Sequence, residues 1–242
     1  MLNDESVLKE DFQTAFPGFA LKQIRLLDLM KSDEVIVAPY AFLSGSSLAT
    51  DFALLQLLCR KYKVKDYLEI GTWRGESAAN VAPYVESVYS FNLGDEQLLS
   101  LGLEKNYVDS HRFFSKDIPN IKHVFGDSQS FDFDQLNKKF DLIFIDGDHS
   151  TKAVERDTKT ALSLRRSEAA IMVWHDAKSD AEYPRFEVLQ GIMDGLPKHM
   201  HQNVYLVKHT LCAVYVPDEI IYKMIHINEV PSREFKITIE QQ

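Results

Sequence analysis

The 242-residue sequence predicts a single large α/β domain with a doubly wound, mainly parallel sheet and an antiparallel hairpin near its C-terminal end. Short apolar runs rich in β-branched and aromatic residues alternate with helical patterns, which is typical of βαβ units. The exception is a pair of runs at 204–208 and 211–216, because only His209 and Thr210 separate them. Parallel strands need a long crossover, so this pair must form an antiparallel hairpin.

The elements follow one another in a regular order. Seven strands are expected, at 66–70, 87–91, 122–125, 142–145, 169–174, 204–208 and 211–216. Helices are expected at 48–62, 77–85, 152–165 and 185–196, with a helical or irregular crossover over 95–116. An amphipathic segment lies near 21–30, and the cluster at 44–47 indicates a turn and a helix N-cap. We therefore expect an N-terminal lid or extension over 1–45, a main domain over 46–217 and a C-terminal extension over 218–242.

Composition excludes several classes of protein. A formal net charge of −9 argues against a nucleic-acid partner, which would be bound by clustered Lys and Arg. No apolar stretch approaches the roughly 20 residues that span a bilayer, so no membrane association is expected. The N-terminus lacks the pattern of a signal peptide. Cys59 and Cys212 are too few for a disulfide framework and are expected to be reduced and buried, which favours a cytoplasmic protein.

Two of the expected strands end in clusters of acidic residues and histidine. Asp146, Asp148 and His149 follow the apolar run at 142–145, and His175 and Asp176 follow the run at 169–174. Open α/β sheets bind their ligands at the carboxyl ends of the strands. The two clusters are therefore expected to form two walls of one active site.

A glycine turn joins the first of the seven strands to its helix. In Glu69-Ile-Gly71-Thr-Trp-Arg-Gly75-Glu-Ser77, the two glycines would let the backbone approach a ligand at the helix N-terminus. The segment lacks the G-x-G-x-x-G loop that a dinucleotide needs. The carboxylate of Glu69 suits a ligand that carries positive charge. Taken alone, however, the segment favours an ordinary tight turn.

Together these motifs resemble those of a known family. The shared features are Glu69-x-Gly71-x-x-x-Gly75, Gly126-Asp127-Ser128, the clusters at 144–149 and 173–176, and the C-terminal hairpin. They resemble class I S-adenosylmethionine-dependent methyltransferases, in particular the divalent-metal-dependent branch that includes natural-product and sugar O-methyltransferases. The similarity covers about residues 45–217. It implies a Rossmann-like fold, S-adenosylmethionine as cofactor, and methyl transfer to a hydroxyl of a small-molecule acceptor.

The resemblance also implies which residues bind the cofactor. These are Glu69, Gly71, Thr72, Gly75, Ser77, Asn92, Asp127, Ser128 and Asp146. The glycine turn would hold the methionine part, Asp127 the adenine amino group, and Asn92 the ribose. At the ribose position Asn92 replaces the family's usual carboxylate; an amide can still bond a diol, and Asp95 or Glu96 could substitute. A turn role for Asn92 and a helix-cap role for Asp127 remain open alternatives.

The resemblance places a divalent metal at Asp146, His175 and Asp176. Mg²⁺ prefers oxygen ligands, and two carboxylates together with substrate oxygens would suffice. The middle position is usually acidic or an amide in the family, and an imidazole at His175 shifts the preference toward Mn²⁺, Fe²⁺ or Zn²⁺. Mg²⁺ or Mn²⁺ is the expected ion. The alternative is that His175 and Asp176 only end a strand and cap a loop.

His149 is the expected general base of the reaction. It follows Asp146 by three residues, within reach of a hydroxyl held by the metal, and its ordinary pKa of ~6.5 suits proton removal near neutrality. Asp148 is expected to cap the following helix together with Ser150.

Two rival functions remain after this interpretation. A metal-dependent hydrolase could use Asp146, His149, His175 and Asp176 around an activated water, but it would leave the glycine turn without a role. A cofactor-binding module without turnover would make Asn92 and His175 the marks of a decayed site. The identity of the acceptor and the formation of a homo-oligomer are left open by the sequence.

Overall fold

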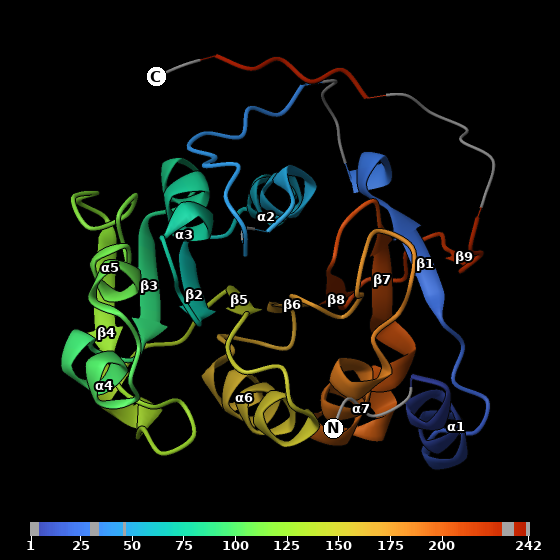
Figure 1. The fold of residues 1–242 in the computed structure, drawn as a ribbon. Coiled ribbons are helices and arrows are strands. Elements are labelled where there is room, and N and C mark those ends of the chain that lie inside the picture. Colours follow the sequence, from blue (N-terminus) through green and yellow to red (C-terminus); the bar gives the residue numbers. More distant parts are fainter. Residues whose placement is uncertain (1–4, 30–33, 46, 229–234, 241–242) are drawn as a thin grey trace.

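The computed structural model describes residues 5–29, 34–45, 47–228 and 235–240. Within them, nine strands form one sheet in the order β4-β3-β2-β5-β6-β8-β7-β1-β9 (Figure 1). The strands are β1 (Lys22–Arg25), β2 (Asp66–Ile70), β3 (Ser87–Asn92), β4 (Ile121–Phe125), β5 (Leu142–Ile145), β6 (Ile171–Trp174), β7 (Val204–Lys208), β8 (Ala213–Tyr215) and β9 (Lys223–Met224).

Helices cover both faces of the sheet. They are α1 (Glu5–Ala15), α2 (Ala49–Tyr62), α3 (Glu76–Val81), α4 (Asp95–Ser100), α5 (Lys105–Asp109), α6 (Thr151–Leu164) and α7 (Phe186–Gly195), with 3₁₀ turns η1 (Leu26–Leu29), η2 (Ala82–Tyr84), η3 (Phe133–Leu136) and η4 (Lys198–Asn203). Helices α2 and α3 lie on one face, and α1, α6 and α7 lie on the other (Figure 1). Among the described residues, no helix is both long enough and apolar enough to cross a membrane.

The predicted doubly wound sheet and its C-terminal hairpin are confirmed. Strand β2 pairs in parallel with β3 and β5, and β5 pairs in parallel with β6. Strand β8 runs antiparallel to both β6 and β7, as the short connection between the two apolar runs requires. All residues of β5 and β6 are buried, which explains why their sequences are continuous apolar runs without alternation.

The sheet separates two hydrophobic clusters. Side chains alternate between the faces of a strand, so Tyr67 packs in the cluster beneath α2 while Leu68 packs in the cluster beneath α6 and α7. Trp174, the largest fully buried side chain, donates its indole N–H to Thr158 on α6 at 2.9 Å. Packing on both faces holds the carboxyl ends of the strands as a rigid edge.

The sheet extends beyond the seven predicted strands. Strand β1 pairs in parallel with β7, and β9 pairs antiparallel with β1. The amphipathic segment expected near 21–30 is thus a strand followed by a 3₁₀ turn; its last residue, Met30, lies outside the described residues. Pairing with β7 gives the backbone of β1 hydrogen-bond partners that the local sequence does not specify.

The start of α2 differs from the expected serine cap. The N-cap residue is Leu48, and its N–H donates to the carboxylate of Asp51 at 2.6 Å. Within the predicted cluster at 44–47, Ser46 lies outside the described residues. Both cysteines, Cys59 and Cys212, are free and buried, as predicted.

Candidate active site

A cavity of about 540 Å³ opens at the carboxyl ends of strands β2 to β6. Its walls include nine of the predicted site residues: Gly71, Thr72, Asn92, Asp127, Ser128, Asp146, His149, His175 and Asp176. Three predicted cofactor residues, Glu69, Gly75 and Ser77, do not line it. The topology therefore brings the ends of five separate strands to one site, as expected for an open α/β sheet.

The structure gives a physical reason for glycine at both positions of the turn that does not involve a ligand. Gly71 has a φ of +97°, and a Cβ there would collide with the backbone of Asp146. Gly75 has a φ of +79°, and a Cβ there would collide with the Ser115 side chain. Both positions favour glycine because the turn packs against the protein itself. The expected close approach of a ligand is not needed to explain them.

Glu69 lies behind the cavity wall, fully buried at the end of β2. Its carboxylate accepts hydrogen bonds from the hydroxyls of Thr72 at 2.7 Å, Ser77 at 2.8 Å and Ser90 at 2.9 Å. Burial raises the pKa of Glu69 to about 7, although the three hydroxyl donors oppose that shift. Glu69 therefore acts on the cavity through Thr72, and its own oxygens are occupied.

The residues predicted to bind ribose and adenine follow β3 and β4 on one wall of the cavity. Asn92 ends β3 and lines the cavity, whereas the carboxylate of Asp95 is bound by Arg112 at 2.8 Å. Asp127 lines the cavity too, but its Oδ1 accepts a hydrogen bond from the N–H of Gln129 at 2.9 Å. Asp127 therefore makes a local hydrogen bond within the turn, and it also lines the cavity.

Asp146, His175 and Asp176 converge at the opposite wall, with one ligand atom of each lying within 4.8 Å of the others. His175 Nδ1 lies 3.0 Å from Asp146 Oδ1 and 3.3 Å from Asp176 Oδ2. Nδ1 is nevertheless buried without a hydrogen-bond partner, because neither contact has suitable angles. Asp176 also has a φ of +52°, a strained conformation that is frequent at functional sites.

The electrostatics of this cluster reflect its high negative charge. Burial alone would lower the pKa of His175, but the carboxylates of Asp146, Asp176 and Asp51 raise it well above its ordinary value. Burial likewise opposes ionisation of Asp176, yet its contacts with His149 and His175 hold the pKa of that carboxyl well below its usual range. The cluster therefore favours a positive charge between its carboxylates.

His149 faces the same cluster from the loop after β5. Its Nε2 lies 3.0 Å from Asp176 Oδ2, and this contact raises the pKa of His149 although burial opposes the shift. Asp176, not Asp148, therefore orients the imidazole. Asp148 accepts a hydrogen bond from the N–H of Ser150, the N-cap residue of α6, at 2.8 Å, but among the described residues no side chain bonds to an N–H within the first turn of that helix.

Several residues of the site could not be identified from the sequence. Trp73, Tyr107 and His111 line the cavity, with 4.9 Å between the ring centres of Trp73 and Tyr107. His111 lies just beyond the end of α5, with 4.9 Å between its ring centre and that of Tyr107. Asp51, buried on α2, contacts the other nitrogen of His175 at 3.2 Å.

Comparison with known proteins agrees with this geometry. Residues 68–177 match the family model of a methyltransferase domain, Methyltransf_24. A search of curated proteins found no match to the chain. Among solved structures, the cofactor-bound protein Rv0187 from MTB is 18% identical, with 72% of this chain and 82% of that chain covered and a TM-score of 0.51.

Two solved O-methyltransferases are more distant in structure. TomG from Streptomyces achromogenes, involved in tomaymycin synthesis and solved with SAM, is 18% identical over 71% of this chain and 81% of its own, with a TM-score of 0.43. The enzyme from Bacillus cereus in complex with SAH is 15% identical over 89% of this chain and 93% of its own, with a TM-score of 0.46.

The fold, the cavity and the family match agree with one another. A parallel sheet with a reversed strand β8 between β6 and β7, and a cavity at the carboxyl ends of β2 to β6, are the features expected of a class I methyltransferase fold. The segment that matches the methyltransferase-domain model, residues 68–177, runs from within β2 to just past β6 and includes most of the cavity wall.

Proposed function

We propose that this protein transfers a methyl group from S-adenosylmethionine to a hydroxyl of a small molecule, with a divalent metal ion at Asp146, His175 and Asp176. The observation that carries the proposal is the convergence of three donor atoms, among them the unpartnered Nδ1 of His175, with His149 beside them on the same cavity. The match to a methyltransferase domain supports the group that is transferred. The metal and base positions support a hydroxyl acceptor.

The remaining wall of the cavity suits the cofactor. Its volume of about 540 Å³ lies within the range of small-molecule sites. Gly71 and Thr72 would hold the methionine part, Asn92 the ribose, and Asp127 with Ser128 the adenine ring. Glu69 would contribute indirectly, because its carboxylate fixes the hydroxyl of Thr72.

The donor set fits a divalent cation. Two carboxylates and one imidazole are suitable ligands for Mg²⁺ or Mn²⁺, and the imidazole favours Mn²⁺. When bound there, such an ion would lower the pKa of the acceptor hydroxyl and fix its oxygen. Asp146 and Asp176 would also neutralise the charge of the ion and hold it at the wall of the cavity.

His149 would take the proton of the acceptor hydroxyl at Nδ1, because its Nε2 lies 3.0 Å from Asp176 Oδ2 and donates to that carboxylate, which holds the ring in place. The hydroxyl oxygen would then form a bond to the methyl carbon as the bond from that carbon to sulfur breaks. The electron pair of the broken bond would stay on sulfur, which would give S-adenosylhomocysteine as a neutral thioether. The protein contributes alignment and deprotonation, and no covalent intermediate is required.

The N-terminal segment would form part of the acceptor side. Gly45 and Ser47 line the cavity. The segment is tied to α3 by a hydrogen bond from the N–H of Ala41 to Glu76 at 2.7 Å. We propose that residues 1–45 act as a lid, 46–217 as the catalytic domain and 218–242 as an extension. The free, buried cysteines support a cytoplasmic location.

The proposal is tested with the Asp146→Ala variant and an Asp148→Asn control. Calorimetry with S-adenosylhomocysteine should give one site per chain in the wild type and in both variants. Mn²⁺ binding should be lost only in Asp146→Ala, because the Asp148 carboxylate serves the start of α6. Methyl transfer should stop with a chelator and return with Mg²⁺ or Mn²⁺.

Each failure has a separate meaning. Absence of S-adenosylhomocysteine binding at millimolar concentration would contradict the cofactor and favour the hydrolase. Binding without methyl transfer to any hydroxyl acceptor would favour a module without turnover. Methyl transfer that resists the chelator would remove the metal from the mechanism.

A further inference from the structure

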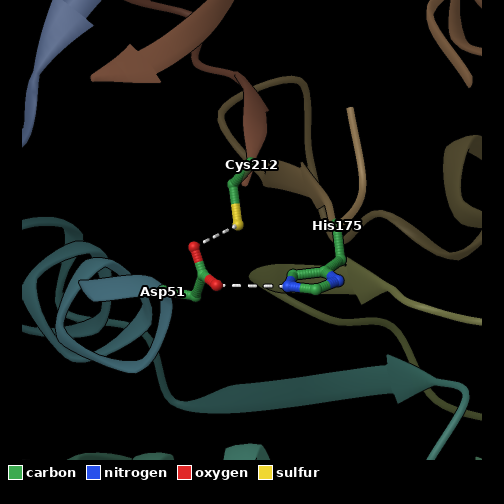
Figure 2. Close-up of side chains that lie close together, drawn as sticks. All are labelled: Asp51, His175 and Cys212. Atoms are coloured by element: carbon green, nitrogen blue, oxygen red, sulfur yellow. Dashed lines mark hydrogen bonds and ion pairs between the residues drawn. The ribbon is translucent and has the colours of Figure 1, made fainter. Parts of the chain in front are cut away.

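Asp51 lies at the centre of a hydrogen-bonded cluster behind the site. Figure 2 shows its carboxylate between the imidazole of His175 and the thiol of Cys212. Asp51 Oδ2 accepts from the N–H of Leu48 at 2.6 Å and contacts His175 Nε2 at 3.2 Å. Its Oδ1 accepts from the N–H of Leu211 at 2.8 Å and from Cys212 Sγ at 3.6 Å. The carboxylate is fully buried, and both of its oxygens are occupied.

Asp51, His175 and Cys212 also have the residue types of a metal site. The hydrogen bonds argue against that function, because a cation would have to displace two backbone N–H donors from a fully buried carboxylate. Burial raises the pKa of the Cys212 thiol well above its ordinary value, so the sulfur keeps its proton and remains a donor. This inner cluster therefore supports the structure around it.

We propose that Asp51 is a positioning residue that holds hydrogen on Nε2 of His175, so that Nδ1 is the nitrogen that gives up its proton and offers a lone pair when a metal binds beside Asp146 and Asp176. A carboxylate surrounded by donors can only accept a hydrogen bond, so the imidazole nitrogen that faces it must carry hydrogen. Metal-binding histidines are commonly held in this way by a carboxylate on their second nitrogen. The inference rests on the proposed function for the role of the metal.

The placement of Asp51 extends its effect beyond the ring of His175. Its two backbone partners, Leu48 and Leu211, belong to the start of α2 and to the turn between β7 and β8. Leu211 lines the cavity, as does Ser47 next to Leu48. One carboxylate thus joins three segments at the rim of the site. Asp51 lies outside the segment that matches the methyltransferase family model, so the preceding helix supplies this support.

The test compares Asp51→Asn with a Cys212→Ser control. The asparagine keeps the size of the side chain and removes its charge, whereas serine changes a different partner of the same carboxylate and leaves His175 untouched. Calorimetric titration with Mn²⁺ should show affinity lowered by roughly 10- to 100-fold in Asp51→Asn. Cys212→Ser should retain wild-type Mn²⁺ affinity within a few-fold. Affinity for S-adenosylhomocysteine should be unchanged in both variants, which excludes general damage to the fold.

A second measurement does not depend on the Asp51→Asn variant. The ¹⁵N chemical shifts of His175, assigned with a His175→Gln protein, report which nitrogen carries hydrogen once the pH is above the raised pKa of the ring and the ring is neutral. Hydrogen on Nε2 of the neutral ring supports the proposal, and hydrogen on Nδ1 of the neutral ring overturns it. Wild-type Mn²⁺ affinity in a folded Asp51→Asn protein overturns it as well. If the wild type binds no Mn²⁺, the metal clause of the proposed function fails while the ring nitrogen still decides the role of Asp51.

Discussion

The Glu69→Gln variant should gain stability over the wild type as the pH rises. Glu69 is fully buried among three hydroxyl donors, and burial raises its pKa from 4.5 to about 7. Because the folded state holds this proton more tightly than the unfolded chain, the free energy of unfolding of the wild type falls between these two pH values. Gln is neutral at every pH, so the free energy of unfolding of the variant does not fall in this way.

The size of the effect follows from the two pKa values. Each unit of difference corresponds to about 1.4 kcal/mol, so the wild type should lose roughly 3 kcal/mol between pH 4.5 and 7. No discount for solvent screening applies, since the carboxyl is fully buried. Above pH 7 the loss is complete. Below pH 4.5 the two proteins should differ only by the fit of the amide among the hydroxyls of Thr72, Ser77 and Ser90.

Urea unfolding of both proteins at pH 5, 6, 7 and 8 measures the difference directly. Other titrating groups cancel in that difference, because both proteins contain them. Glu86→Gln is a matched control, since Glu86 is exposed and its replacement should give a nearly constant difference. A difference between wild type and Glu69→Gln that is independent of pH, or that favours the wild type at pH 8, would refute the reasoning.

Three further variants test separate parts of the site. Gly71→Ala should lower the free energy of unfolding by about 3 kcal/mol or more without any ligand present, because the added Cβ would collide with the backbone of Asp146. Gly102→Ala is the control: Gly102 also has a positive φ, but a Cβ there meets open space, so the loss should be about 1 kcal/mol. Equal losses in urea unfolding would contradict the packing argument. His149→Ala should lower kcat by roughly 10²- to 10⁴-fold at unchanged S-adenosylhomocysteine affinity, and an unchanged kcat would remove it as the base. Asn92→Asp should tighten S-adenosylhomocysteine binding by about fivefold in calorimetry, because a charged acceptor strengthens the bonds to a diol; weaker binding would contradict a ribose contact.

The strands around the site were readable from sequence because their environment is simple. Strands β5 and β6 are buried on both faces, and their apolar runs end abruptly where the sheet meets the cavity. The change from Ile145 to Asp146 and from Trp174 to His175 therefore marked both the strand ends and the site. A parallel sheet aligns such ends without any information beyond the order of the elements.

The features that were missed depend on partners far along the chain. Strand β1 has only four residues and is specified by pairing with β7, not by its own pattern. The role of Asp51 was missed for the same reason. An acidic residue in the first turn of a helix is ordinary, and the histidine partner of Asp51 lies 124 positions away. The packing of Gly71 against the backbone of Asp146 was also not predicted, since no sequence pattern distinguishes a ligand from the backbone of a neighbouring loop.

The hydrogen bonds of Asp51 have a consequence for the order in which the site is assembled. The wall that would hold the cofactor comes from strands β2 to β5, which are local βαβ units. The ring of His175 is held by Asp51 across 124 positions, and Asp51 is itself held by the turn after β7 through a bond that spans 160 positions. Closing such long loops is a late event in folding. The half of the site proposed to hold the metal is therefore completed after the half proposed to hold the cofactor.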